Sequence, residues 1–165
     1  MAIPVMEWYP LKPIPGGQPG KGFFNRLMAD PTWVCEAKLN GRRAIWDGKI
    51  LWGRQGQLVP KCSHVTNHLQ GIPALDGEWF GNELWCFDLP DHGGTFSERR
   101  EALGQLVAEI SCPHIHAMPR CDDWAAVSQN EWEGVVFKKL SSKYKKALQH
   151  SKTTADWIKF RAEWE

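Results

Sequence analysis

The 165-residue sequence lacks the features of a secreted or membrane-embedded protein. Its five cysteines are odd in number and form no Cys-x-x-Cys pair, and neither a signal peptide nor a long apolar stretch precedes them. Unpaired cysteines without a secretion signal indicate reduced thiols. No segment is apolar enough to span a bilayer. These absences predict a cytoplasmic protein with no membrane partner.

The chain also lacks a strong net charge, because 20 basic residues offset 19 acidic ones and leave a formal charge of +1. Composition alone therefore does not indicate a nucleic-acid-binding protein. The charge is nevertheless uneven, since the stretch from Lys138 to Arg161 holds eight cations and a single acid, Asp156. Such a stretch is typical either of a phosphate-facing surface or of a solvated helix face.

Internal repeats and low-complexity blocks are absent as well. Hydrophobic residues make up 42% and charged residues 24% of the chain, which excludes a disordered protein, and the length suits one domain. Residues 1–22 are rich in proline and glycine and predict an extended arm. The remaining patterns predict strands over 33–38, 43–46, 49–52, 74–80, 83–89, 114–118, 134–138 and 157–161, and helices over 23–28, 63–70, 97–109 and 122–127.

Strands outnumber helices in this reading, and the turns between them are short, which predicts an α+β fold with antiparallel sheets. Asn40-Gly41 is a turn signal, so we expect the strands on either side of it to pair in an antiparallel meander. Ser97 is the expected N-cap of the longest helix.

Lys38 is a candidate nucleophile at the end of a predicted strand. A lysine attacks only after its ammonium loses a proton, and neighbouring cations or a metal lower its pKa. Arg42 and Arg43 are close in sequence, and Gly41 allows the backbone to approach a ligand. Taken alone, such a turn also fits an ordinary hairpin.

Further charged or aromatic strand ends follow Lys38 in order. They are Gly53-Arg-Gln-Gly56, Asp76-Gly-Glu78, Phe87-Asp88, Glu133-Gly-Val-Val-Phe-Lys138 and Lys159-Phe-Arg161. Together they offer a nucleophile, carboxylates for a metal or a ribose, a stacking ring and cations for phosphate. Phosphoryl transfer depends mostly on positioning and charge neutralisation, and these are the residue types that it requires.

This ordered set resembles the motifs of the covalent nucleotidyltransferase superfamily, and within it the ATP-dependent DNA ligases. Lys38-Leu-Asn-Gly-Arg-Arg43 is similar to the first motif, Lys-x-Asp-Gly-x-Arg, with Asn40 in place of the aspartate. Gly53 stands where a serine is usual, and Arg161 where a second lysine is usual. The resemblance covers the chain from about Leu11 to the C-terminus. It implies a ligase-type adenylation domain that uses ATP and Mg²⁺ or Mn²⁺.

By this resemblance, Lys38 would carry AMP through a phosphoramidate bond. The resemblance implies that Glu36 contacts the adenine edge, that Phe87 stacks on the adenine face, and that Glu78 and Arg43 hold the ribose. It implies that Glu133 and Glu78 bind the metal and that Lys159 and Arg161 hold the α-phosphate. Arg54 would bind the 5′-phosphate of the nick. The expected partner is a nicked duplex. The resemblance also implies that the protein acts as a monomer in the cytoplasm and serves DNA replication or repair. The duplex backbone is expected to contact Lys143, Lys145, Lys146 and Lys152.

The chain ends four residues after Arg161, where ligases of this family usually continue into an OB-fold domain. We therefore expect residues 1–165 to form a single adenylation domain without an OB-fold domain.

Two other kinds of metal site, and three other functions, are compatible with the sequence. His64 and His68, or Cys112, His114, His116 and Cys121, have spacings that a metal could use, although alternation on one strand face is commonly structural. An RNA ligase or an mRNA-capping guanylyltransferase would share most of the motifs. A nucleic-acid-binding module without catalysis would share the fold.

Asn40 generates a prediction about the 3′ strand. The resemblance places the usual aspartate near the reacting 3′ end, where an amide keeps hydrogen bonding but loses the charge. A ribose 2′-hydroxyl both donates and accepts a hydrogen bond, and an amide answers both. We expect AMP-loaded protein to seal a nick with a 3′-terminal ribonucleotide at least as fast as an all-DNA nick. A clear preference for DNA, or an unchanged rate ratio in Asn40→Asp, would contradict this expectation.

Overall fold

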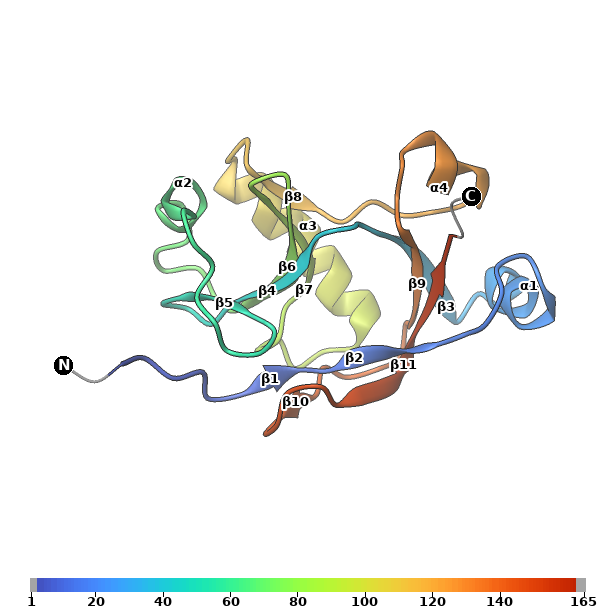
Figure 1. The fold of residues 1–165 in the computed structure, drawn as a ribbon, viewed down its shortest axis with the longest axis horizontal. Coiled ribbons are helices and arrows are strands. Elements are labelled where there is room, and N and C mark those ends of the chain that lie inside the picture. Colours follow the sequence, from blue (N-terminus) through green and yellow to red (C-terminus); the bar gives the residue numbers. More distant parts are fainter. Residues whose placement is uncertain (1–2, 163–165) are drawn as a thin grey trace.

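The computed structural model describes residues 3–162 as two β-sheets with helices on their outer faces (Figure 1). The four-stranded sheet has the order β2-β11-β9-β3, and the five-stranded sheet has the order β5-β4-β6-β7-β8. A short pair, β1-β10, lies at one edge. Most strand pairs are antiparallel, and the exceptions are β2 with β11 and β7 with β8. The predicted α+β class is confirmed.

From β3 onward most elements match the predicted ranges to within three residues. The exceptions are α2, which ends at Thr66 and not at residue 70, β11, which begins at Thr153 and not at residue 157, and β10, which was not predicted. The strands are β1 (Tyr9–Pro10), β2 (Lys12–Pro15), β3 (Trp33–Lys38), β4 (Arg42–Trp46), β5 (Leu51–Gly53), β6 (Leu75–Phe80), β7 (Glu83–Asp88), β8 (Ile115–Ala117), β9 (Gly134–Lys139), β10 (Lys146–Ala147) and β11 (Thr153–Arg161). The helices are α1 (Gly22–Ala29), α2 (Ser63–Thr66), α3 (Phe96–Ile110) and α4 (Ala125–Gln129). The predicted extended arm contributes two strands of its own. Within residues 3–162, no helix is long and apolar enough to cross a membrane.

The predicted hairpin around Asn40-Gly41 is wrong. β3 pairs with β9 in one sheet, whereas β4 pairs with β5 and β6 in the other. The chain therefore crosses between the sheets at Leu39–Gly41 (Figure 1). Gly41 serves a close backbone approach, because a Cβ there would lie 2.3 Å from the carbonyl oxygen of Trp79 on β6. This crossing places Lys38 and Arg43 on different sheets.

Helix α3 covers the five-stranded sheet, and its start differs from the prediction. Thr95, not Ser97, is the N-cap, because its side chain accepts a hydrogen bond from the Glu98 amide, and the Glu98 carboxylate accepts one from the Thr95 amide. This reciprocal pair satisfies two amides that would otherwise lack partners. The helix buries Phe96 and Leu103, and Leu103 belongs to a core that includes Trp46 of β4.

A second core fills the space between α1 and the four-stranded sheet, around Phe24, Phe137 and Phe160. The three rings meet edge to face, with centroids 5.1 to 5.6 Å apart, the arrangement that aromatic quadrupoles favour. Each sheet therefore has an apolar core on its own outer side, and the space between the sheets holds polar residues together with a smaller apolar cluster that includes Ala37, Phe87 and Trp157.

Arg99 and Asp88 form a buried ion pair that fastens α3 to β7. Their side chains are 1% and 0% exposed, and Nε of Arg99 lies 2.6 Å from Oδ1 of Asp88. The guanidinium also donates to the carbonyl oxygens of Gly94 and Ser142. The pair thus joins three segments.

Asp88→Asn should destabilise the fold strongly, because it leaves a buried guanidinium without a counter-charge. Breaking such a pair typically costs about 3–5 kcal/mol. The matched control is Asp122→Asn, whose partner Arg120 is exposed and 3.8 Å away, and exposed pairs contribute about 0–1 kcal/mol. Urea denaturation measures both free energies of unfolding. Equal losses in the two variants would contradict the role given to the buried pair.

Candidate active site

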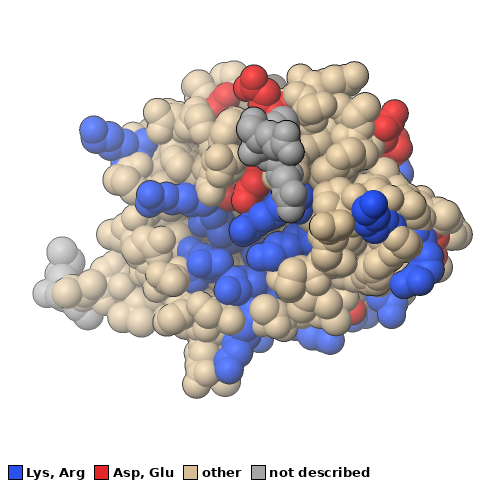
Figure 2. Space-filling model, turned by 45° about the vertical axis from the view of Figure 1, so that its right-hand side comes forward, with Lys and Arg blue, Asp and Glu red and all other residues tan. Residues whose placement is uncertain are grey.

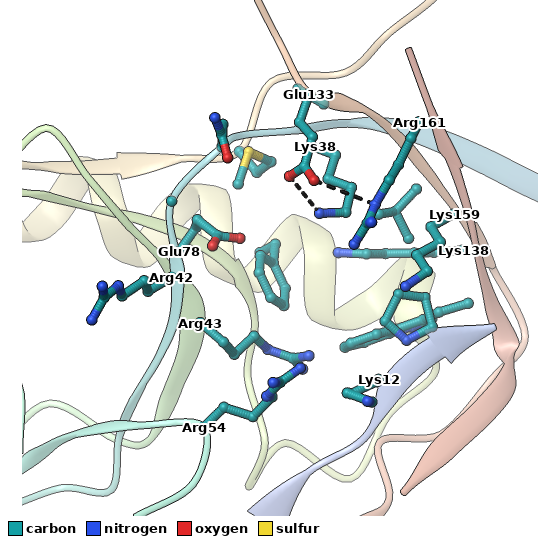
Figure 3. A pocket seen from close by; sticks show the side chains of 18 of the residues that line it. Lys12, Lys38, Arg42, Arg43, Arg54, Glu78, Glu133, Lys138, Lys159 and Arg161 are labelled. Atoms are coloured by element: carbon teal, nitrogen blue, oxygen red, sulfur yellow. Dashed lines mark hydrogen bonds and ion pairs between the residues drawn. The ribbon is translucent and has the colours of Figure 1, made fainter. Parts of the chain in front are cut away.

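A polar cavity of about 520 Å³ lies between the two sheets. This volume lies in the range of small-molecule sites. Side chains from β2, β3, β4, β6, β7, β9 and β11 converge on it (Figure 3). Its walls include Lys12, Lys38, Asn40, Arg42, Arg43, Arg54, Glu78, Phe87, Met118, Glu133, Val136, Lys138, Trp157, Lys159 and Arg161.

Lys38 lies in this cavity as the last residue of β3, and strand pairing brings two distant motifs beside it. Gly134 of β9 is opposite both Lys38 of β3 and Arg161 of β11. Nζ of Lys38 donates to Oε2 of Glu133 at 2.7 Å, and Nε of Arg161 lies 3.3 Å from the other carboxylate oxygen. One carboxylate therefore serves two cations in the resting site.

Glu78 faces the same point from the other sheet. It is opposite Arg43 in the β4–β6 pairing. Burial raises the pKa of Glu78 to about 7, against the lowering effect of Lys38 and Arg43. Glu133 adds to the rise by repulsion. The two carboxylates therefore share one electrostatic environment around Lys38, and Glu78 titrates near neutrality.

Arg43 is part of the cavity wall and is rigidly held. Its Nε and one terminal nitrogen bond both carboxylate oxygens of Asp76 at 2.7 and 2.5 Å, and the other terminal nitrogen donates to the Leu11 carbonyl at 2.8 Å. The Tyr144 hydroxyl donates to the same carboxylate at 2.7 Å. Bidentate pairing fixes the guanidinium plane.

Phe87 forms an apolar part of the wall together with Trp157, whose ring centroid lies 5.7 Å away at a right angle. Nζ of Lys138 lies 3.9 Å from the Phe87 centroid and 2.6 Å from Oε1 of Glu36. Arg100 bonds the other oxygen of Glu36 at 2.9 Å. Glu36 is 2% exposed and lies behind the wall, so Lys138 is the charged group that reaches the cavity there.

Four further cations, Lys12, Arg42, Arg54 and Lys159, line the cavity without an ion pair to any residue within 3–162. Figure 2 shows basic side chains gathered around the central hollow of this face. Burial lowers the pKa of Lys159, and so do the nearby charges of Arg161, Lys38 and Lys12. The cavity therefore carries more positive charge than its own carboxylates neutralise, which suits an anionic ligand.

Sequence reasoning missed Lys12, Arg42 and Lys138 as cavity residues. Lys138 ends the Glu133–Lys138 motif, so its place in that motif was an available signal. Arg42 was named only as a cation close to Lys38 in the sequence, because alternation could not assign its face without the strand pairing. Lys12 lies in the proline-rich arm, where the sequence carries no pattern that points to a site.

The predicted basic run does not reach the cavity. Lys143 donates to the Gly93 carbonyl at 2.8 Å, Lys145 lies 3.7 Å from Asp156, and Lys146 pairs with Asp91. Lys152 has no ion pair with another residue in the described range and is exposed. By contrast, the other predicted nucleic-acid contacts, Asn40 and Arg54, do line the cavity.

The alternative metal sites are not formed by residues 3–162, where no group of three or more histidine, cysteine or acidic side chains could hold an ion. His116 instead bonds Glu83 at 2.7 Å and stacks on Trp85, with centroids 4.2 Å apart. His64 bonds the Asn82 carbonyl at 2.6 Å. These histidines have structural partners.

Comparisons with known proteins identify the fold. No protein-family model matches the chain. A DNA ligase of Haemophilus influenzae is 26% identical over 144 residues, which cover 69% of this chain and 54% of the relative. The chain thus spans about half the length of that relative.

Two solved structures agree with this comparison. A Lig E DNA ligase superposes with a TM-score of 0.67 at 19% identity, covering 90% of this chain and 69% of that one. A mycobacterial DNA ligase D complexed with ATP gives 0.65 at 23% identity, covering 92% and 60%. The chain has the nucleotidyltransferase fold of DNA ligases, and the resemblance drawn from the motifs is confirmed at that level.

Glu78 should make stability depend on pH in a defined window. Its pKa of about 7 in the fold lies above the ordinary value of 4.5. Between these values the folded chain holds the proton more tightly than the unfolded chain, so the free energy of unfolding falls as the pH rises, and it levels off above about 7.

Glu78→Gln should lack this component. The measurement is the difference in unfolding free energy between the wild type and Glu78→Gln at several pH values across and above the window. A difference that stays constant with pH, or that grows in favour of the wild type, would show that burial does not control this carboxyl group.

Proposed function

We propose that this chain is the nucleotidyltransferase part of an ATP-dependent polynucleotide ligase that seals nicks between a 3′-hydroxyl and a 5′-phosphate. The observation that carries the proposal is the position of Lys38, which meets two carboxylates and a surplus of cations inside one cavity. The ligase fold and the order of the motifs support it. A lysine in such a cavity is suited to attack a phosphorus atom surrounded by negative charge.

In the proposed first step, the Lys38 amine attacks the α-phosphorus of ATP. A phosphorus–nitrogen bond forms, the bond to the bridging oxygen breaks, pyrophosphate leaves, and the amine gives up its proton. Nζ of Lys38 donates to the Glu133 carboxylate at 2.7 Å in the resting site, so that carboxylate is within reach to accept the proton that the amine gives up. The AMP group then passes to a 5′-phosphate oxygen, and the 3′-hydroxyl displaces AMP.

The cavity walls support an assignment for each part of the nucleotide. We assign the base to the apolar wall of Phe87, Met118 and Val136, and the ribose to Glu78 with Arg43 behind it. Lys159 and Arg161 would hold the α-phosphate. We assign the base edge to Lys138, with Glu36 acting through it, because Glu36 is covered by Lys138 and Arg100.

The carboxylates of Glu133 and Glu78 fit a magnesium or manganese ion. They approach Lys38 from opposite sheets, and the pKa of Glu78 is raised mainly by burial and to a smaller extent by repulsion from Glu133. Mg²⁺ usually takes one or two carboxylates and completes its shell with water and substrate phosphates. When bound, such an ion would shield the phosphates from one another.

The competing functions differ in nucleotide or in chemistry. A capping guanylyltransferase would use GTP, and a non-catalytic module would form no covalent adduct. An RNA ligase would prefer RNA ends. Incubation with radiolabelled ATP or GTP therefore separates the first two alternatives, and nicked substrates separate the third.

Lys38→Ala should abolish covalent labelling by ATP, because it removes the only atom to which AMP is proposed to bind. The measurement is acid-labile radiolabel retained on the chain after denaturing electrophoresis. Lys49→Ala, an exposed lysine outside the cavity, is the control and should label like the wild type. Label retained in Lys38→Ala would refute the nucleophile assignment.

The proposed nucleic-acid surface lies mainly on the cavity rim. Arg42 and Arg54 have no ion pair within 3–162, whereas Lys145 and Lys146 already have carboxylate partners. We propose that Asn40 and Arg54 contact the ends of the nick. Weaker contacts to the duplex backbone are assigned to Lys143, Lys145, Lys146 and Lys152. A cation that neutralises a phosphate contributes about 0.9 to the slope of log affinity against log salt.

Replacing Arg42 and Arg54 with serine should therefore reduce the salt slope by up to about 2. Replacing Lys145 and Lys146 with serine removes the same charge and should reduce the slope less. Binding to a nicked duplex at several salt concentrations measures both. A larger reduction of the salt slope from the Lys145 and Lys146 replacements would show that the duplex binds mainly to the basic run and not to the cavity rim.

We also place the protein in the cytoplasm. All five cysteines are free thiols, and four of them are buried, which is typical of a reducing compartment.

A further inference from the structure

Lys12 is a cation that the proposed reaction has not yet used. Its backbone amide donates to the Lys152 carbonyl at 2.8 Å, and the carbonyl of the preceding residue, Leu11, accepts a bond from Arg43. Strand β2 is thereby fastened to both sheets. Figure 3 shows Lys12 at the β2 edge of the cavity, below Lys159, with which it shares the cavity wall. A lysine held so firmly at its backbone has a defined position.

The charged groups of the cavity lie in an order that runs from Glu78 to Lys12. Lys38 is close enough to influence both Glu78 and Lys159. Lys12 is among the charges that act on Lys159, but the charges that dominate at Glu78 are Lys38, Arg43, Glu133 and Asp76. Strand pairing gives the same order along β11. Arg161 is level with Lys38 through Gly134, Lys159 follows opposite Pro15, and Lys12 is opposite Thr153 farther along the sheet. Lys38 therefore stands between a Glu78 end and a Lys12 end.

This order defines the direction of a bound nucleoside triphosphate. With the ribose at Glu78 and the α-phosphorus at Lys38, the β- and γ-phosphates extend toward Lys159 and Lys12. Lys12 has no ion pair within residues 3–162, so its three donors are available. The triphosphate would also relieve the repulsion among the Lys12, Lys38, Lys159 and Arg161 charges.

We propose that Lys12 is a pyrophosphate-binding residue, which contacts the β- and γ-phosphates of ATP and stabilises the leaving group of the first step. The assignment rests on the proposed function. As the bond between the α-phosphorus and the bridging oxygen breaks, its electron pair stays on the departing pyrophosphate. The Lys12 ammonium lies where that charge develops, and it exchanges no proton or covalent bond. It has no such role after pyrophosphate has left.

The test separates the step that releases pyrophosphate from the steps that follow. Lys12→Ala and Lys12→Arg are compared with Lys21→Ala, which removes an exposed lysine of the same N-terminal segment outside the cavity. Three rates are measured: labelling by ATP, removal of AMP from loaded protein by added pyrophosphate, and sealing of a nick whose 5′-phosphate already carries AMP.

Lys12→Ala should slow labelling by about 10- to 100-fold, since removing one preorganised contact to developing charge has effects of about this order or larger. It should raise the pyrophosphate concentration needed for half-maximal removal of AMP. Sealing of the pre-adenylylated nick should stay at the wild-type rate. Lys12→Arg should recover most of the loss, and Lys21→Ala should match the wild type throughout.

Unchanged labelling and unchanged pyrophosphate dependence in Lys12→Ala would overturn the assignment. A loss confined to the pre-adenylylated nick would also overturn it and would place Lys12 on the nucleic-acid strand. A wild-type chain that takes no label from ATP refutes the proposed function, and this assignment with it. A wild type that labels normally isolates the failure to Lys12. Circular dichroism of each variant shows that it is folded.

Discussion

The cavity depends on one ion pair, that between Arg43 and Asp76. Asp76 is fully buried, and burial alone would lower the pKa of Arg43, but the carboxylate outweighs burial and raises that pKa. The pair joins β4 to β6, accepts Tyr144 from the segment before β10, and holds the Leu11 carbonyl of the N-terminal arm. Truncating either partner would leave a buried charge without compensation. The positions of Glu78 on β6 and Lys12 on β2 both follow from it.

A second constraint is the imbalance of charge within the cavity. The walls present many cations, and only some of them have a carboxylate partner. Lys138 forms an ion pair with Glu36, and Arg43 forms one with Asp76. Lys38 and Arg161 share Glu133. The remaining rim cations have no ion pair within residues 3–162 and can meet a ligand. In the resting site Lys38 is therefore paired with Glu133, while the rim cations attract an anionic ligand. We expect that ligand to displace the Lys38–Glu133 ion pair when it binds.

Much of the fold followed from local patterns. Alternation identified the strands that became β3, β6, β7 and β9, and the short gap between the predicted strands 74–80 and 83–89 is a turn at Gly81-Asn82, with both residues at positive φ. Local patterns failed where a partner lay elsewhere. Asn40-Gly41 is an ordinary hairpin signal, yet β3 pairs with β9 and β4 pairs with β6. The two strands separate because the buried face of each packs on a different core.

The sequence by itself determined the chemistry of the site. The spaced motifs predicted that five residues belong to one active site, and all five line one cavity: Lys38, Glu78, Phe87, Glu133 and Lys159. Only the tertiary structure decided which charges are available. Glu36 and Lys138 are 102 residues apart and neutralise each other, while Lys146 pairs with Asp91, 55 residues away. A sequence lists charges but not their neighbours, and ion pairing depends on distances through space. For that reason the basic run was expected to be free, and Lys12 was not expected in the site.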